Sequence, residues 1–458
     1  MKTAARAFAV ALAFAAGGPL TAETLPEAVQ KALSTNPGQS AAFEATRAAV
    51  LDLASLRGRY LPQVTLTGSV GAERISNPGS LSASDNETVQ FARQIGVGAE
   101  YVIYDGVQRA QQVYASAAQV DAALYSLWDA SDTLALNVVE TYADVARNRL
   151  LKSMSEESLR LHRRVASQIE DAVAGGSLPQ SEALQVRDRV LAAEVSDAEI
   201  GAALASAEAR YLAVVSGPPS GRMRTSLPTG LPASQAELLD AAVASNGRLL
   251  AAQAGSEAAR AEAARASAPN RPRVTVNADV GAAEDIGGSE GSQNNMFLGL
   301  RLSWSLFEGG SSARGDAAEA RRAQAEAREA STRRDIERAV ADAWIAHQSV
   351  TTTRSVLERQ TAANESIVRQ FRSEFESGDR SLLNVLDAER TLLGLKIQLA
   401  SARASEVVSA HRLLATQGAL ASYFGIEQAG VAVDPNFAER ARNRPMATAM
   451  SASDLTRN

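Results

Sequence analysis

The side chains that carry most enzyme chemistry are scarce in this sequence. No cysteine is present, and the three histidines, His162, His347 and His411, have no partners at metal-ligand spacing. The paired acids at 156–157 are typical of a solvated helix face, and the serines lie in no G-x-S-x-G turn. A phosphate-binding G-x-x-x-x-G-K-[ST] loop is also missing. The sequence therefore predicts a protein that is not an enzyme, with no metal and no cofactor.

The segment GDRSLLNVLDAER, residues 378–390, places polar side chains at the edge of an apolar helical face. Asn384 and Asp387 are three residues apart, so both project from one face of a helix. Around an axis shared by several copies, Asp387 would form a ring of carboxylates, and a narrow throat with one sign of charge attracts cations. The alternative is that Asp387 is solvated or pairs with Arg390 on the same helix.

An internal repeat determines which elements position this segment. Four blocks of the first half align with four blocks of the second half, in the same order and at offsets between 202 and 210 residues. The aligned pairs are 32–37 with 242–247, YLPQVTLTGSVG (60–71) with NRPRVTVNADVG (270–281), 102–106 with 305–309, and GGSLPQSEAL (175–184) with SGDRSLLNVL (377–386). Such a match in order and spacing indicates two structural units of the same design.

Each repeat is predicted to contain a helical segment, a β-hairpin and a long helical pair. The predicted boundaries are a first repeat at 23–220 with a hairpin at 60–106 and a long pair at 107–216, a linker at 221–232 rich in Pro, Gly and Ser, and a second repeat at 233–425 with a hairpin at 271–309 and a long pair at 310–421. Residues 1–22 read as a signal peptide, and 426–458 read as a loose tail without periodicity.

The hairpin segments alternate with a period of two, which predicts strands with one apolar and one polar face. In 64–72 the residues Val, Leu, Gly, Val and Ala alternate with Thr, Thr, Ser and Gly. In 298–306 the residues Leu, Leu, Leu, Trp and Leu share the apolar face. Aromatic residues cluster where strand becomes helix, as at a membrane interface: Tyr101, Tyr104, Trp304 and Phe307.

The long helical segments have the apolar spacing of coiled coils. Proline is absent from 108 to 178 and from 310 to 434, and apolar residues recur every three or four positions. A helix over about 107–174 would be roughly 100 Å long. The turns GGS (175–177) and SGD (377–379) fold each segment back, and Ser177 and Asp379 are the predicted N-caps of the returning helices.

Composition restricts the partners and the compartment. The charged start and short apolar core of residues 1–22 predict export, and no later apolar run reaches the roughly 18 residues of a membrane helix. The net charge of −6 argues against a nucleic-acid partner. These features leave open a soluble periplasmic protein and an outer-membrane β-barrel.

Four two-faced strands are too few for a barrel made by one chain. Strand edges are not tolerated in lipid, and the smallest membrane barrels have about eight strands. Two chains would give a barrel of eight strands with a filled interior, and three chains a barrel of twelve with an open pore. The small polar residues of one face favour three chains.

This plan resembles the TolC family of outer-membrane channel-tunnel proteins. The resemblance covers nearly the whole mature chain and depends on the tandem repeat together with YLPQVTLTGSVG, YDG, FEGG and GDRSLLNVLDAE. It implies an α+β membrane protein in which four strands per chain contribute to a trimeric twelve-stranded outer-membrane barrel. A long periplasmic coiled-coil tunnel continues the barrel, and its tip docks an adaptor protein and an inner-membrane transporter.

The resemblance also assigns residues at the tip. Arg380 matches the arginine that links tip helices, Glu182 matches its acidic partner, and Phe375 stands where the family often has a tyrosine. Asn384 and Asp387 match two acidic ring positions, so Asn384 departs from the pattern. The turns that would contact the adaptor are Gly175, Gly176, Ser177, Gly378 and Asp379.

The sequence favours a passive exit duct, and the form of LLNVLDAERTLL and GGSLPQSEALQ resembles members that serve type I protein secretion with an ABC transporter. The first alternative is a channel of a proton-driven drug or ion efflux pump. A soluble periplasmic coiled-coil adaptor is an alternative of another class, against which the four two-faced strands argue.

Overall fold

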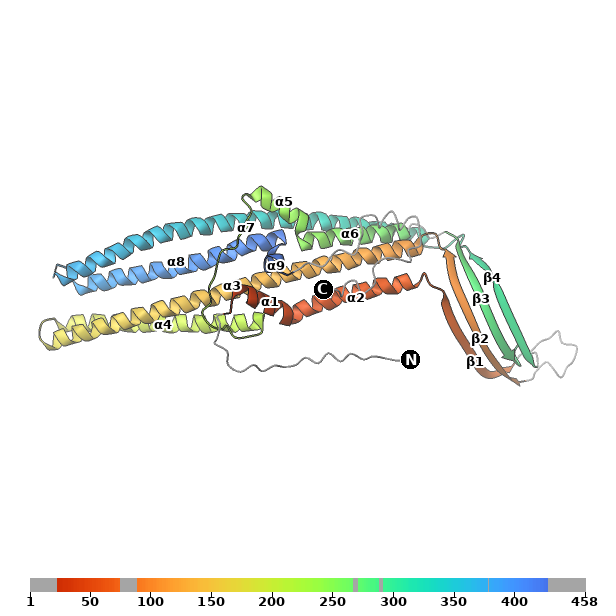
Figure 1. Ribbon diagram of the computed structural model, residues 1–458, viewed down its shortest axis with the longest axis horizontal. Coiled ribbons are helices and arrows are strands. Elements are labelled where there is room, and N and C mark those ends of the chain that lie inside the picture. Colours follow the sequence, from red (N-terminus) through yellow and green to blue (C-terminus); the bar gives the residue numbers. More distant parts are fainter. Residues whose placement is uncertain (1–22, 75–88, 267–270, 288–290, 378, 427–458) are drawn as a thin grey trace. The chain divides into compact units, whose positions relative to one another are not determined.

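A computed structural model describes residues 23–74, 89–266, 271–287, 291–377 and 379–426 (Figure 1). The predicted signal peptide, Gly378 and all of the predicted tail except Ile426 lie outside the described residues.

The two halves of the chain contain the same elements in the same order. Each half has two shorter helices, two strands and two long helices, which confirms the tandem repeat. The first half comprises α1 (Leu25–Thr35), α2 (Pro37–Gly58), β1 (Gln63–Arg74), β2 (Val89–Tyr104), α3 (Gln108–Ala174) and α4 (Gln180–Val215). The second comprises α5 (Gln235–Ser245), α6 (Gly247–Ala266), β3 (Arg273–Glu284), β4 (Ser292–Ser303), α7 (Ser311–Glu376), α8 (Leu382–Gln417) and the short α9 (Leu420–Tyr423).

The chain forms two compact units, and each unit draws on both repeats. Of the described residues, unit 1 comprises those in 23–40, Ala130–Ser245 and 337–426. Unit 2 comprises the described residues in Ala41–Asp129 and Asn246–Ile336. The helices α3 and α7, of 67 and 66 residues, begin in unit 2 and end in unit 1. Helices this long exist because no proline interrupts the backbone hydrogen bonds.

In unit 1 the long helices form antiparallel pairs, α3 with α4 and α7 with α8 (Figure 1). Ion pairs link each pair across the seam: Lys152 with Asp197 at 2.8 Å and Arg354 with Glu406 at 2.8 Å. The core lies where α1, α3, α4 and α8 meet, around the fully buried Tyr142. The hydroxyl of Tyr142 donates to the carbonyl of Glu23 at 2.9 Å, so the polar end of this large ring is satisfied.

In unit 2 the helices pack through small residues and a few long-range polar contacts. Leu53 of α2 packs with Val113, Ala117 and Val120 of α3. The hydroxyl of Tyr114, which also packs against this cluster, donates to Glu257 of α6 at 3.0 Å. Arg260 of α6 in turn pairs with Glu326 of α7 at 3.1 Å. These contacts place α2, α3, α6 and α7 side by side in that order.

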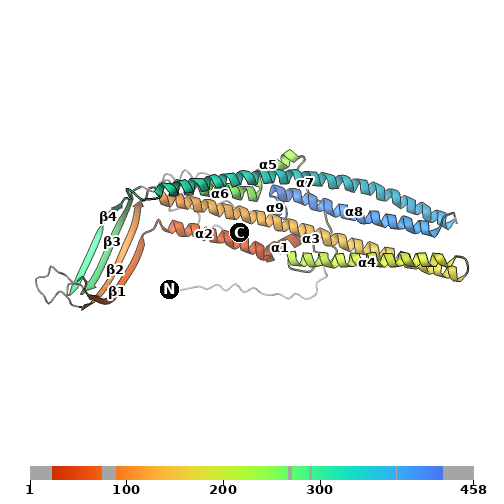
Figure 2. The ribbon, with the colours of Figure 1, turned by 180° about the vertical axis from the view of Figure 1, so that it is seen from behind.

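The four strands of unit 2 form one antiparallel sheet in the order β1-β2-β3-β4 (Figures 1 and 2). The register pairs Leu66 of β1 with Val97 of β2, Val97 with Val280 of β3, and Val280 with Met296 of β4. Directly opposed residues in an antiparallel sheet lie on the same face. The alternation predicted for each strand is therefore in phase across the whole sheet.

Gly247 offers a test of the packing between α6 and α3. A Cβ atom at Gly247 would lie 2.6 Å from the carbonyl oxygen of Tyr125 and 2.9 Å from the amide nitrogen of Asp129, which are backbone atoms of α3 that cannot rotate away. We expect Gly247→Ala to destabilise the protein by about 1–3 kcal/mol, as overpacking does. Thermal unfolding in detergent, followed by circular dichroism, measures this.

Gly255 of the same helix is the matched control, because a Cβ atom there meets nothing within 4 Å. Gly255→Ala should raise the stability by about 0.5–1 kcal/mol through higher helix propensity. Equal melting temperatures for the two variants would contradict the close approach of α6 to α3.

Candidate functional site

One face of the sheet is apolar and exposed. Leu66 is 69% exposed, Met296 is 82% exposed and Leu298 is 76% exposed, although side chains of this kind are normally buried. They belong to a continuous patch formed by Val64, Leu66, Val70, Ile95, Val97, Val276, Val280, Met296, Leu298, Leu300 and Leu302. A patch of this extent on a folded chain indicates contact with lipid or another protein.

The opposite face of the sheet is polar. Arg273 pairs with Glu100 at 2.7 Å, and the hydroxyl of Thr275 lies 2.6 Å from the amide oxygen of Asn277. A carboxylate oxygen of Asp279 lies so close to Gly98 that a Cβ atom there would be only 2.7 Å away. The glycine thus makes room for a charged side chain on this face. One water-facing and one lipid-facing surface are what the wall of a membrane barrel requires.

The predicted alternation extends further than the strand does. Trp304 and Leu306 were predicted to continue the apolar face, but β4 ends at Ser303, so that part of the prediction is wrong. Beyond the strand the ladder of hydrogen bonds to β3 has ended, and alternation no longer decides the side-chain direction. The exposed aromatic residues at this boundary include Tyr101 and Tyr104 at the end of β2 and Trp304 and Phe307 after β4.

The two helical turns share one backbone geometry. The amide of Ser177 donates to the carbonyl of Ala172 at 2.9 Å, and the amide of Asp379 donates to the carbonyl of Glu374 at 2.9 Å. These bonds, from residue i+5 back to residue i, are the mark of the Schellman motif, which closes a helix C-terminus. Gly176 supplies the left-handed conformation this motif needs, with φ +77°. Gly175, Gly176, Ser177 and Asp379 are all exposed.

The predicted N-caps are wrong by two residues. The N-cap of α4 is Pro179 and that of α8 is Ser381, and neither makes a side-chain capping bond. Ser177 and Asp379 instead belong to the motifs that end the preceding helices. Their backbone amides are already committed to Ala172 and Glu374, so the returning helices begin two residues later.

Asn384 and Asp387 are both exposed on one face of α8, as their spacing predicted. Asp387 makes an ion pair across the helix interface with Arg189 of α4 at 3.1 Å. No ion pair joins it to Arg390, although both residues are described. The carboxylate remains 57% exposed, so it faces water while a half-buried guanidinium reduces its field. The sequence pattern contained no signal for Arg189, because this contact joins different helices.

Arg380 lies beside the helix that precedes it. Its Nε is 2.5 Å from Glu374, and its guanidinium carbon lies 3.6 Å from the ring centre of Phe371. Hydrogen bonds from Gln370 and Arg380 hold the pKa of Glu374 below its ordinary value, so this ion pair stays charged at neutral pH. Glu182 lies half-buried in the first turn of α4, and Phe375 is exposed. Within the described chain, the ion pair of Arg380 is made with Glu374 and not with Glu182.

Below these turns, the ends of the helical pairs are held by a small apolar cluster. Val165 and Ile169 of α3 pack with Val186 of α4 and Leu386 of α8. Leu386 is buried while its neighbour Asp387 is exposed. This explains why a carboxylate lies at the edge of so apolar a segment: the leucines fasten α8 to α3 and α4, and that packing aims Asp387 outward.

The three histidines lie on long helices. Among the described residues, no group of three or more His, Asp and Glu side chains could hold a metal ion. His411 is buried, its Nδ1 lies 2.7 Å from the carbonyl oxygen of Val407, and its ring stacks on Phe424. Burial lowers the pKa of His411, so the ring is neutral and serves packing. None of the helices in the described ranges has both the length and the apolarity needed to cross a membrane.

Comparison with known proteins identifies the family. The family "Outer membrane efflux protein" matches residues 28–215 and 238–419, which is most of the chain. The chain belongs to this family. The two matched ranges correspond to the two halves of the repeat. Membership decides against the interpretation as a soluble adaptor, and places the protein in the outer membrane as an efflux channel of a three-part system.

Individual relatives agree with this family. The chain is 24% identical to the outer membrane efflux protein BepC of Brucella suis over 427 residues, which cover 90% of this chain and 89% of BepC. Two solved structures share the fold, each with a TM-score of 0.75. The first is a membrane protein from Pseudomonas aeruginosa, at 20% identity over 87% of this chain and 90% of that one. The second is the Campylobacter jejuni CmeC outer membrane channel, at 15% identity over 92% and 89%.

The direction of the apolar face can be tested with neighbouring substitutions on β1. Leu66→Lys of this outer membrane efflux protein puts a charge on the apolar face, which costs about 2–4 kcal/mol near the middle of a bilayer. We expect much less folded protein in the outer membrane, measured by semi-native gel electrophoresis and blotting of membrane fractions.

Thr67→Lys is the matched control, because Thr67 is one residue further along the strand and therefore on the polar face. It should assemble at nearly the normal level. If Thr67→Lys were the more harmful substitution, the face that contains Thr67 would be the one in contact with lipid, and the assignment made here would be wrong.

Proposed function

We propose that this chain forms a passive exit duct as a homotrimer, with three four-stranded sheets closing one barrel of twelve strands. The observation that carries the proposal is the two-faced sheet with two free edges. Within the described residues, β1 and β4 each pair with one neighbour only, so each leaves a row of backbone donors and acceptors open. In lipid these groups must be satisfied by another strand, and β4 of one copy next to β1 of the next copy satisfies them.

The helical turns are the part of the duct that meets other proteins. We assign the contact with a periplasmic adaptor to Gly175, Gly176, Ser177, Gly378 and Asp379. Support comes from the exposure of the described turn residues and from Leu178, an apolar side chain that is 39% exposed directly after the first turn. An exposed leucine beside small residues suits an apolar anchor contact. The energy for transport comes from an inner-membrane partner, since this chain has no nucleotide-binding motif.

Asp387 provides the charge of the gate. In a trimer its three copies surround the axis, with Asn384 one turn nearer the mouth as a ring of neutral amides. The Arg189 guanidinium 3.1 Å away offsets part of this charge, so cation attraction at this mouth is weaker than a bare ring of aspartates would give. The link between Arg380 and Glu182 remains a proposal for a contact between neighbouring copies, because within one copy Arg380 pairs with Glu374.

The cargo we favour is a protein exported by a type I system with an ABC transporter. The support is the resemblance of LLNVLDAERTLL and GGSLPQSEALQ to members with that role. Efflux of drugs or ions by a proton-driven pump is the second candidate, and the name of the Brucella suis relative, an outer membrane efflux protein, favours it.

The gate can be tested by recording single channels in a planar bilayer. Asp387→Asn should reduce cation selectivity and weaken block by divalent cations, because it removes the carboxylate ring. Arg189→Gln should act in the opposite direction and strengthen the divalent block by roughly twofold, because it unmasks the same carboxylate. Two variants with shifts of the same sign would contradict the pairing, and no shift in Asp387→Asn would contradict its place at the gate.

The cargo can be tested by deleting the gene. If the duct serves type I secretion, the culture supernatant should lose one or a few large proteins, while susceptibility to drugs and metal ions stays unchanged. Mass spectrometry of supernatants and growth inhibition assays measure the two outcomes. Increased susceptibility with an unchanged supernatant would instead support the efflux pump, and a plasmid-borne copy of the gene should reverse either defect.

A further inference from the structure

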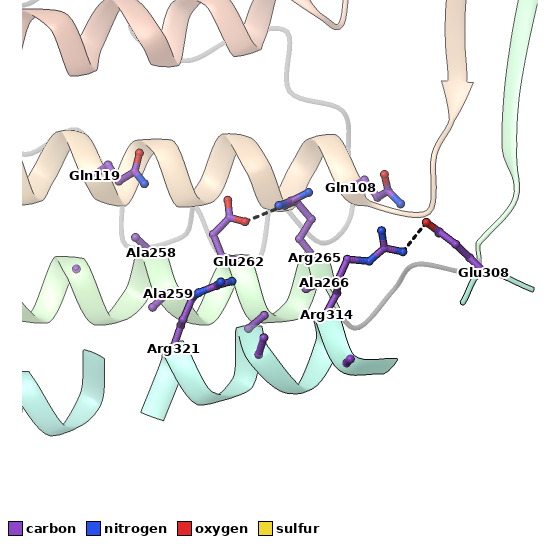
Figure 3. A pocket seen from close by; sticks show the side chains of 14 residues that line it. Gln108, Gln119, Ala258, Ala259, Glu262, Arg265, Ala266, Glu308, Arg314 and Arg321 are labelled. Carbon is purple, nitrogen blue, oxygen red and sulfur yellow. Dashed lines mark hydrogen bonds and ion pairs between the residues drawn. The ribbon is translucent and has the colours of Figure 1, made fainter. Parts of the chain in front are cut away.

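Two adjoining pockets lie in unit 2 where the strands give way to the helices. The first is a groove of about 910 Å³ between α3, α6 and α7, with a floor of alanines (Figure 3). The second, of about 560 Å³, lies at the ends of β1, β2 and β3 beside α2 and α3. Both are lined by Gln108 and Arg265, and the two pockets together are here called the junction surface.

The junction surface opens on the polar side of the sheet. The strand residues that line it are Gln63, Glu100, Val102 and Arg273. Gln63 lies directly opposite Glu100 in the register, and Arg273 makes its 2.7 Å ion pair with the same Glu100, so these residues belong to the polar face. In the channel proposed above, the polar face lines the lumen. The junction surface then lines the lumen as well, and the inference that follows rests on that proposed function.

Arginines outnumber carboxylates on this surface. Its lining contains six arginines and four carboxylates: Arg59, Arg109, Arg265, Arg273, Arg314 and Arg321 with Glu100, Asp105, Glu262 and Glu308. Each carboxylate is already bound to one arginine. The pairs are Arg273 with Glu100 at 2.7 Å, Arg109 with Asp105 at 2.6 Å, Arg265 with Glu262 at 2.8 Å and Arg314 with Glu308 at 2.6 Å.

Two guanidinium groups are therefore left in excess in every chain. Arg59 donates from Nη1 to the neutral amide oxygen of Gln112 at 3.2 Å. Arg321 has no carboxylate within ion-pair distance in the described part of the chain, and Figure 3 shows its side chain beside Ala259. Both side chains are exposed, so their charge acts on the water of the groove.

The helix ends at this surface add charge of the same sign. The long helices α3 and α7 both begin here, at Gln108 and Ser311, and an N-terminus carries about half a positive charge. Neither helix has an acidic residue in its first turn, where Arg109 and Arg314 lie, but Asp105 and Glu308 precede the two helices and pair with these arginines. A cation at this end is unfavourable for the helix by about 0.3–1 kcal/mol.

We infer that the junction surface is a cationic filter in the lumen, which favours solutes and cargo segments that carry carboxylate or phosphate groups. Guanidinium groups bind such oxyanions through paired hydrogen bonds, and a confined passage with one sign of charge concentrates ions of the opposite sign. Three copies around the axis would carry six excess arginines. The sign is opposite to that of the whole chain, whose net charge is −6, and to that of the exposed Asp387.

The experiment measures the reversal potential of the full-length protein in a planar bilayer under a KCl gradient. The double variant Arg59→Gln with Arg321→Gln removes the excess charge without touching the four ion pairs. We expect its Cl⁻/K⁺ permeability ratio to fall by about twofold or more near 0.1 M KCl, where the Debye length is about 10 Å. The difference should shrink near 1 M KCl, where that length is about 3 Å. Arg59→Lys with Arg321→Lys keeps the charge and should keep the normal ratio.

The double variant Arg222→Gln with Arg224→Gln is the charge-matched control, because both are exposed arginines of the linker that do not line the junction surface. It should leave the ratio unchanged. Normal conductance with an unchanged ratio in the double glutamine variant would overturn the cationic filter and leave the channel standing. Absence of any conductance from the unmodified protein would overturn the channel and the filter together. Both substituted side chains are exposed, and assembly of the variants is checked by semi-native electrophoresis.

Discussion

The constraint on which this structure depends is that a strand in lipid must have every backbone hydrogen bond satisfied. The sheet meets this condition between β1 and β4 but not at its two outer edges. Its apolar face, with Leu298 76% exposed, is equally incomplete in a single chain. A soluble protein would cover such a face with helices. Here the helices leave the sheet at its ends, so both the lipid and further copies of the chain have to complete it.

The repeat explains how one design rule produces both the sheet and the helical pairs. Each half contributes one hairpin to the sheet and one long pair to the helical part. The number of strands therefore stays equal to the number of long helices. The acid that precedes each long helix shows the rule in detail. Asp105 and Glu308 occupy the same place in the two halves, and each pairs with an arginine in the first turn of the following helix, Arg109 and Arg314. The pairing is kept although the spacing between acid and arginine differs.

Much of the fold could be predicted from sequence because it follows from periodicity. Alternation with period two gave the strands, spacing of three and four gave the helices, and aligned blocks gave the repeat. What could not be predicted depends on contacts between elements. Arg189 reaches Asp387 only because Leu386 fastens α8 to α3 and α4. The N-caps were misplaced because Ser177 and Asp379 have residue types suited to an N-cap, while their amides close Schellman motifs. The residue types suggested that they begin the following helices, whereas the backbone geometry shows that they end the preceding ones.

The charged side chains of this protein fall into two groups: those that pair with a neighbour of opposite sign and those that do not. Many of the described arginines have a carboxylate neighbour, and such exposed pairs contribute little to stability. Such pairs cancel charge locally, so the field at each site is set by the charged groups there that have no partner of opposite sign. Asp387 is only partly cancelled, and Arg59 and Arg321 have no acid beside them. In the duct proposed above, two charged sites of opposite sign would keep any one kind of ion from binding strongly along the whole length. A duct gains from that arrangement, because a solute attracted at one site is not held at the next.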